Sequence, residues 1–177
     1  MNVKGFGYKI KNRHASGENS HSKHPPVSDI NTQPSYPPRP AFPGISPMLK
    51  TGILNPQLNS LLSRVRHTNT LVIADRGFPF WPGIETIDLS LVDGVPTVLQ
   101  VLEAVRANFV IGEVRMAAQF RTHNTGETQA AFARALEGIP VSYEDHEAAF
   151  KPRVPRAIGL VRTGDTTPYA NLILTSA

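Results

Sequence analysis

Residues 70–75 read Thr-Leu-Val-Ile-Ala-Asp, an apolar run that ends on an acidic side chain. The run is short and its β-branched residues favour extended backbone, so it predicts a buried strand. Asp75 stands at the polar carboxyl end of that strand. Glycines and prolines follow across residues 77–83 and predict a loop, which places Asp75 at the boundary between strand and loop.

Segments with helical and extended patterns alternate along the chain after residue 48. Asn55 and Pro56 precede leucines spaced three and four residues apart, which predicts a helix that ends near His67. Further helices are expected over residues 96–105 and 128–136 and after Asp145, and further strands over residues 85–91, 109–120, 139–143, 157–162 and 171–174. This alternation predicts a layered α/β fold, a single domain over residues 48–177 with a central mixed sheet flanked by helices.

The net charge of the chain comes from the residues before the predicted domain. Of 18 basic and 14 acidic residues, six basic and two acidic ones fall in residues 1–47, so residues 48–177 hold 12 of each. The Pro-, Ser- and His-rich composition of residues 1–47 provides too little apolar area to offset the entropy of ordering, which predicts a disordered basic tail. An alternative is that Met48 is the natural start. Because the domain is neutral, nucleic acid is not an expected partner.

Several classes of protein are excluded or disfavoured by what the sequence lacks. The longest apolar runs fall far short of the roughly 18 residues that a membrane span needs, so no membrane partner is expected. No apolar stretch follows the first lysines, which argues against secretion, and the chain contains no Cys, so a cytoplasmic location is expected. The Gly-x-Ser-x-Gly motif of many hydrolases and the P-loop motif are both missing from the sequence.

His67 and Asp75 are the side chains most suggestive of chemistry. A histidine at a helix end and an aspartate at a strand end, converging on a loop rich in Gly and Pro, would suit general acid–base catalysis near neutral pH. The plainer alternative is a histidine that only caps a helix. The aromatic residues Phe78, Phe80 and Trp81 could line a sugar-binding face, and a hydrophobic loop anchor or subunit contact explains them equally well.

Three ordered blocks of sequence then carry a resemblance to a known family. They are residues 67–79 (His-Thr-Asn-Thr-Leu-Val-Ile-Ala-Asp-Arg-Gly-Phe-Pro), residues 93–102 (Asp-Gly-Val-Pro-Thr-Val-Leu-Gln-Val-Leu) and residues 162–174 (Arg-Thr-Gly-Asp-Thr-Thr-Pro-Tyr-Ala-Asn-Leu-Ile-Leu). The chain from Met48 onward resembles the family of D-ribose pyranases and L-fucose mutarotases. The resemblance does not extend to the tail.

The resemblance implies roles for six residues. The catalytic histidine of the family falls on His67. The positions that bind the sugar fall on Asp75, His146, Tyr169, Ala170 and Asn171. His123 lies near a His-Asn stretch of the family, but no role is implied for it.

The reaction implied by the resemblance interconverts β-D-ribopyranose and β-D-ribofuranose. The hemiacetal opens and recloses through a different hydroxyl, so one proton leaves the anomeric hydroxyl and another reaches the ring oxygen. An imidazole can transfer both protons, so no cofactor and no metal are implied. Family members are decamers of two pentameric rings with active sites near subunit boundaries, which implies a homodecamer here.

The chain also departs from the family pattern. Arg66 and Arg76 replace small residues beside His67 and Asp75, so two cations are expected to crowd the site. The chain stops at Ala177, short of the last few residues of relatives, which puts a subunit contact in question. The Tyr-Ala-Asn motif favours ribose, because the fucose branch typically has Tyr-Gly-Asn. A mutarotase for another sugar such as L-fucose and a non-catalytic sugar-binding homologue remain the alternatives.

Overall fold

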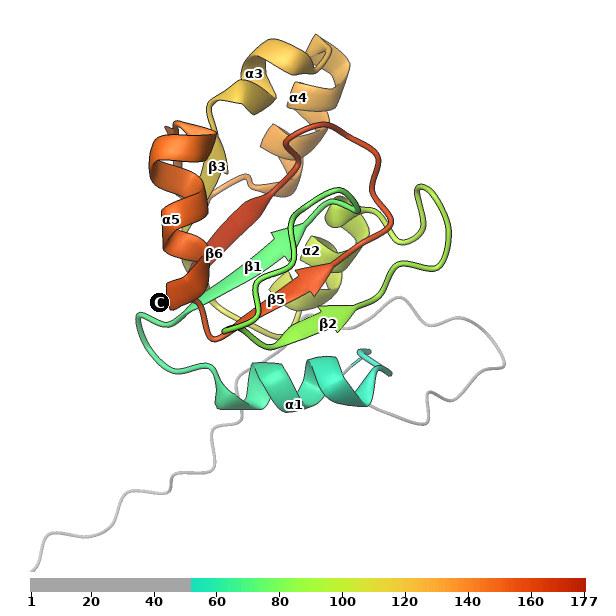
Figure 1. The fold of residues 1–177 in the computed structure, drawn as a ribbon, viewed down its shortest axis with the longest axis vertical. Helices are drawn as coiled ribbons and strands as arrows, with labels where there is room; N and C mark the ends of the chain where they lie inside the picture. The colour runs from blue at the N-terminus through green and yellow to red at the C-terminus, as the bar shows by residue number, and fades with distance from the viewer. Residues whose placement is uncertain (1–51) are drawn as a thin grey trace, which may run out of the picture. The chain divides into compact units, whose positions relative to one another are not determined.

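A six-stranded mixed sheet forms the centre of the computed structural model, which describes residues 52–177 (Figure 1). The strands are β1 (Thr70–Ala74), β2 (Thr86–Asp88), β3 (Ile111–Ala117), β4 (Val141–Glu144), β5 (Gly159–Arg162) and β6 (Leu172–Ser176). The helices are α1 (Pro56–Arg64), α2 (Val98–Arg106), α3 (Gln119–His123), α4 (Gly126–Ala135), the π-helix η1 (His146–Phe150), α5 (Lys151–Arg153) and the 3₁₀-helix η2 (Val154–Arg156). The predicted α/β fold with a mixed sheet flanked by helices is confirmed. The expectation for residues 1–47 lies outside the described residues.

The sheet order β2-β5-β1-β6-β3-β4 places β1 near the middle of the sheet. β1 pairs in parallel with β5 and antiparallel with β6, in a register that sets Ile73 opposite Leu172 and Thr70 opposite Thr175. The end of β1 therefore meets the beginning of β6, and the beginning of β1 meets the end of the chain. Figure 1 shows these two meeting points at opposite ends of β1.

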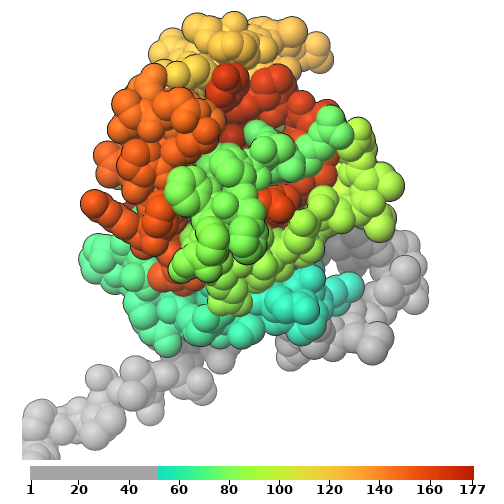
Figure 2. All heavy atoms as spheres, in the orientation of Figure 1, coloured from blue at the N-terminus to red at the C-terminus, as the bar shows by residue number. Residues whose placement is uncertain are grey.

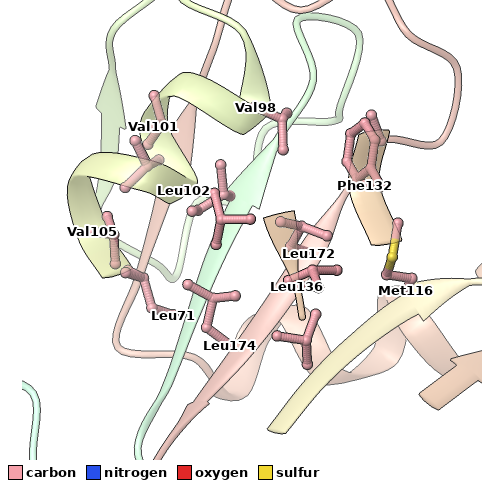
Figure 3. Packing of buried hydrophobic residues seen from close by; sticks show 14 of the residues in the cluster. Leu71, Val98, Val101, Leu102, Val105, Met116, Phe132, Leu136, Leu172 and Leu174 are labelled. Carbon is pink, nitrogen blue, oxygen red and sulfur yellow. The ribbon is translucent and has the colours of Figure 1, made fainter. Parts of the chain in front are cut away.

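The alternation of side chains along β1 separates two apolar layers. Leu71 and Ile73 belong to the larger core cluster, which also contains the buried side of α2 (Figure 3). Val72 and Ala74 belong to a second cluster on the other face, formed with η1 and the loop after β1. Each fully buried aliphatic side chain contributes about 1.5–3 kcal/mol, so both faces of β1 stabilise the sheet.

The loop after β1 covers the sheet next to η1 and α5, as the green and orange surfaces of Figure 2 show. Phe78 is buried in the second cluster and Trp81 packs against it, whereas Phe80 is 66% exposed. The aromatic loop is therefore largely a hydrophobic anchor, with one side chain left at the surface. No helix among residues 52–177 is both long and apolar enough to cross a membrane.

Several boundaries differ from the expectations, for local reasons. α2 begins at Val98, because Thr97 and Gln100 form a capping box at its start, so Pro96 precedes the helix. β3 ends at Ala117, and α3 occupies residues that were expected to continue the strand. α1 ends at Arg64, so the position near His67 is a turn and not a helix end.

Candidate active site

Asp75 and Asn171 form a closed pair at the carboxyl end of β1. The side-chain oxygen Oδ1 of Asn171 accepts a hydrogen bond from the backbone N–H of Asp75, and its Nδ2 donates to Oδ2 of Asp75, both at 2.9 Å. The other carboxylate oxygen of Asp75 accepts from the backbone N–H of Gly77 at 2.9 Å. The antiparallel pairing of β1 with β6 brings together these two residues, which lie 96 positions apart in the sequence.

Burial raises the pKa of the Asp75 carboxyl above its ordinary value of 3.8, and the nearby Asp165 carboxylate raises it further. The hydrogen bonds from Asn171 and Gly77 and the proximity of His146 act in the opposite direction. Asp75 is thus a partly desolvated carboxylate at the end of a strand, where a hydrogen-bonding ligand would replace lost water.

His146 lies at the beginning of η1 and is 8% exposed. Its helix begins there because the side chain of Asp145 accepts hydrogen bonds from the backbone N–H groups of Glu147 and Ala148. The imidazole packs edge-on against Tyr169, with ring centroids 5.0 Å apart. Its Nε2 is buried and has no hydrogen-bond partner within residues 52–177. A buried donor or acceptor without a partner is costly, so this atom calls for a polar partner that the described residues do not provide.

Tyr169 lies between two histidines. His146 contacts one side, and the ring of His123 approaches with a centroid separation of 4.8 Å. Tyr169 has a φ of 58°, a left-handed conformation that is unfavourable for an aromatic residue. Asn124 supports it, because its Nδ2 donates to the carbonyl of Pro168 at 2.8 Å. The position of Tyr169 therefore depends on the end of α3, a helix that the sequence patterns did not predict.

The loop between β5 and Tyr169 is fixed by the buried carboxylate of Asp165. Its Oδ2 accepts from the backbone N–H of Val98, at the beginning of α2, and its Oδ1 accepts from that of Thr167, both at 2.8 Å. Ala170, fully buried, packs in the larger core cluster, and its N–H bonds to the carbonyl of Thr167. The hydrogen bonds of Asp165 and the contacts of Ala170 together hold the Tyr-Ala-Asn motif at the carboxyl end of β1.

His67 lies at the opposite end of β1. It is exposed in the turn that leads into the strand, where Thr68 donates its N–H to Ser176 and Asn69 accepts from Ser176. β1 alone spans about 13 Å at roughly 3.3 Å per residue, and His67 and Asp75 lie beyond its two ends. The expected convergence of the two residues on one loop is therefore wrong within a single chain, because the strand between them is extended.

The turn at His67 is strained. Thr68 has a φ of 66°, and it and Tyr169 are the two non-glycine residues with positive φ among residues 52–177. A β-branched residue in this region is an outlier that costs on the order of 1–3 kcal/mol. Thr68 directly follows His67, and Tyr169 is itself a residue to which the resemblance assigns a function.

The two arginines expected to crowd the site point elsewhere. Arg66 donates to the carbonyls of Ser63 and Val65 at 2.8 Å, which satisfies the end of α1. Arg76 forms an exposed ion pair with Asp93 at 2.5 Å. Neither guanidinium is directed at the Asp75–Asn171 pair in these contacts.

Two hollows of the described surface lie apart from His146 and Tyr169. A groove of about 590 Å³ runs between α2 and α4, and a smaller one of about 260 Å³ lies beside Asp165. No group of three or more His, Cys, Asp or Glu side chains within residues 52–177 is arranged to hold a metal ion.

Sequence reasoning missed three side chains next to the predicted site. Gln119 accepts from the backbone N–H of His146 at 3.0 Å and donates to Asp145 at 2.9 Å, which ties α3 to η1. His123 contacts Tyr169, and Glu147 contacts His146. Only the adjacency of Glu147 to a predicted site residue could have indicated any of these contacts.

The comparisons with known proteins agree with the resemblance. Residues 48–177 match the RbsD / FucU transport protein family. D-ribose pyranases of Geobacillus thermodenitrificans and Geobacillus kaustophilus are each 43% identical to this chain over 129 residues, which cover 73% of it and 96% and 93% of those proteins. These relatives are, by name, isomerases.

Solved structures show the same architecture. Bacillus subtilis RbsD complexed with D-ribose has a TM-score of 0.68 and 35% identity, covering 73% of this chain and 98% of that one. The fucose mutarotase of Streptococcus pneumoniae in complex with L-fucose has a TM-score of 0.60 and 21% identity over 72% of this chain and 94% of its own, and so shares the fold. By sequence and by structure, the chain belongs to the RbsD / FucU family.

Proposed function

We propose that this protein is an isomerase that interconverts β-D-ribopyranose and β-D-ribofuranose. One observation carries the proposal: Asp75, His146, Tyr169 and Asn171, far apart in the sequence, gather at the carboxyl end of β1. The resemblance assigns sugar binding to these same positions. The D-ribose pyranases at 43% identity, and RbsD complexed with D-ribose at 35% identity, support ribose as the substrate.

The gathered side chains have the chemistry that a small sugar needs. Asp75 is an acceptor for sugar hydroxyls, and the orphaned Nε2 of His146 offers a second polar contact. The ring of Tyr169 provides an apolar wall next to them. Asn171 keeps the Asp75 carboxylate in one orientation through its two hydrogen bonds. A sugar bound at these residues would exchange its contacts with water for contacts with side chains that are already held in place.

We further propose that His67 of a second copy of the chain completes this site. Within one chain, β1 separates His67 from the sugar-binding residues by more than the length of a sugar ring. The exposed turn at His67 is free to approach another copy, and the resemblance implies a decamer with active sites near subunit boundaries. The proposed assembly, a cytoplasmic homodecamer of two pentameric rings, would place one His67 at each site.

The proposed catalysis consists of a ring opening and a ring closure, each with two proton transfers. In ring opening, the imidazolium of His67 donates a proton to the ring oxygen as the C1–O5 bond of ribopyranose breaks, and the resulting imidazole takes up the proton that the anomeric hydroxyl loses as the aldehyde forms. In ring closure, the C4 hydroxyl attacks the aldehyde carbon, the imidazolium protonates the carbonyl oxygen, and the imidazole takes up the proton of the C4 hydroxyl. General acid–base catalysis of this kind contributes about 10²–10⁴ in rate. The step consumes no co-reactant.

Saturation-transfer NMR between ribose anomers of the pyranose and furanose forms tests the proposal. The wild-type protein should accelerate exchange and the His67→Ala variant should not, while both bind ribose in calorimetry. If wild type and variant gave the same exchange, the catalytic role of His67 would be refuted. Running L-fucose beside ribose distinguishes the alternative mutarotase, and ribose binding without accelerated exchange by wild type would indicate a non-catalytic homologue.

A further inference from the structure

The two ring nitrogens of His146 have different surroundings. Nδ1 lies 3.2 Å from Oε1 of Glu147, the next residue in η1. Nε2 is buried and has no partner within residues 52–177. The ring is held in this orientation by contacts with Phe78, Phe150 and Tyr169, at centroid separations of 6.1, 5.8 and 5.0 Å. One nitrogen therefore lies beside a carboxylate, and the other is buried without a partner of its own.

The carboxylate that faces Nδ1 is held in its ionised form. Lys151 donates to the same Oε1 of Glu147 at 2.6 Å, an i,i+4 ion pair. The hydrogen bond from Lys151 lowers the pKa of Glu147, more than any other influence on that carboxyl. Glu147 itself is exposed, so the pair contributes little to the stability of the fold. The ionised carboxylate of Glu147 acts instead on the neighbouring imidazole of His146.

The ionised carboxylate limits the tautomer of His146. An ionised carboxylate can only accept a hydrogen bond, so a proton on the neighbouring Nδ1 is favoured. In the neutral ring, Nε2 then holds a lone pair and can only accept. The hydroxyl groups of a sugar are donors that such an atom can use.

The π-helical geometry of η1 supports this arrangement. The backbone N–H groups of Ala149 and Phe150 both reach the carbonyl of Asp145, and that of Lys151 reaches the carbonyl of His146. The turn is widened relative to an α-helix, and such turns occur frequently at functional sites. With this spacing, Lys151 pairs with Glu147 while Phe150 packs against the imidazole.

From these contacts we propose that Glu147, held by Lys151, is a positioning residue that fixes His146 in the Nδ1–H tautomer, so that Nε2 accepts a hydrogen bond from a sugar hydroxyl. The inference rests on the proposed function only for the identity of the ligand. The tautomer itself is a property of the protein without sugar. Glu147 does not touch the reacting atoms, and its role is exerted through His146.

Long-range ¹H–¹⁵N NMR of the full-length protein, labelled at histidine, tests this inference without sugar. His146 is assigned by the signal that disappears in His146→Gln. Wild type should show a protonated Nδ1 and an unprotonated Nε2. Glu147→Ala should give a mixture of tautomers, and Lys151→Met should give a smaller change in the same direction. Glu147→Gln should keep the Nδ1–H form, because its amide oxygen still accepts a hydrogen bond. Glu103→Ala, an exposed acidic position on α2, is the matched control and should leave the signals unchanged.

Ribose kinetics of the same variants provide the second measurement. Glu147→Ala should raise KM about tenfold with a smaller change in kcat, and Glu147→Gln should restore KM. A wild-type tautomer in Glu147→Ala, or an unprotonated Nδ1 in wild type, would overturn the inference even if ribose exchange is normal. A Glu147-dependent tautomer in a protein that neither binds nor isomerises ribose would instead refute the proposed function and leave the inference intact.

Discussion

The two ends of β1 contrast in how they are built. At the carboxyl end, Asp75 and Asn171 bind each other, burial raises the pKa of Asp75, and aromatic rings enclose His146. At the amino end, His67 is exposed in a strained turn that the final strand residue, Ser176, holds through backbone hydrogen bonds. One end has binding groups without the proposed catalyst, and the other has the catalyst without binding groups.

On the proposed function, the two ends of β1 are two half-sites. A rigid strand keeps them apart, so they cannot join by a local change of conformation. A second copy can join them if the amino end of one β1 meets the carboxyl end of another. Substitutions at either end of β1 test this contrast, and their expected effects decrease in the order that follows.

The largest effect is expected from mixing two inactive variants. His67→Ala should lower ribose isomerisation by about 10²–10⁴, and Asp75→Ala should lower it through lost sugar binding, because each removes one half of every site. Subunits of both, mixed after partial dissociation and reassembly, should recover activity, because some sites then combine an intact His67 with an intact Asp75. Saturation-transfer NMR measures the recovery. Reassembled samples of either variant alone are the controls, and absence of recovery in verified mixed oligomers contradicts sharing of the site between subunits.

Removal of the Asn171 amide should destabilise the carboxyl end of β1. Asn171→Ala leaves the Asp75 backbone N–H and Oδ2 without their partners, which should lower the free energy of unfolding by about 2–3 kcal/mol. Urea denaturation measures the change. Asn108→Ala is a matched control, because its side chain makes only an exposed bond to the carbonyl of Ala104, and it should cost far less. Equal losses for the two variants would show that the pair does not hold this end together.

Relief of the backbone strain in the turn at the amino end of β1 should change the free energy of unfolding less, and in the stabilising direction. Thr68→Gly removes the penalty of a β-branched residue at a φ of 66° and should raise the free energy of unfolding by about 1 kcal/mol. Thermal unfolding measures the gain. Thr122→Gly, within α3, should instead lower stability, because glycine is unfavourable inside a helix. A loss of stability in Thr68→Gly would mean that the turn is not strained.

The smallest effect is a difference in the pH dependence of stability. Because the pKa of Asp75 is raised in the folded state, the folded protein binds this proton more tightly than the unfolded chain. Its contribution to stability is present below pH 3.8 and is lost as the pH rises through the folded-state pKa. The stability of wild type relative to Asp75→Asn should therefore fall over that interval, measured by urea denaturation at a series of pH values. A relative stability that rises with pH would contradict the direction of the shift.

Much of the fold follows from local sequence patterns. The apolar run at residues 70–75 forms β1, Asn55 caps α1, and Asp145 caps η1, as predicted. α3 was not predicted because residues 119–123 mix apolar and polar side chains, and five residues are too few for their spacing to distinguish a helix from a strand. The helices α2 and α4 begin after the N-cap residues Thr97 and Thr125. Pro96 and the apolar spacing predicted these starting points less accurately.

By itself the sequence determined the family, the α/β class and the position of Asp75 at the carboxyl end of a buried strand. Tertiary structure alone decided which residues meet. Antiparallel pairing brings Asn171 to Asp75 across 96 positions, and the end of α3 places His123 against Tyr169. The same extended strand separates His67 from Asp75, although only eight positions divide them. Local pattern specifies the conformation of a segment, whereas proximity depends on the direction and register in which strands from distant parts of the chain pair.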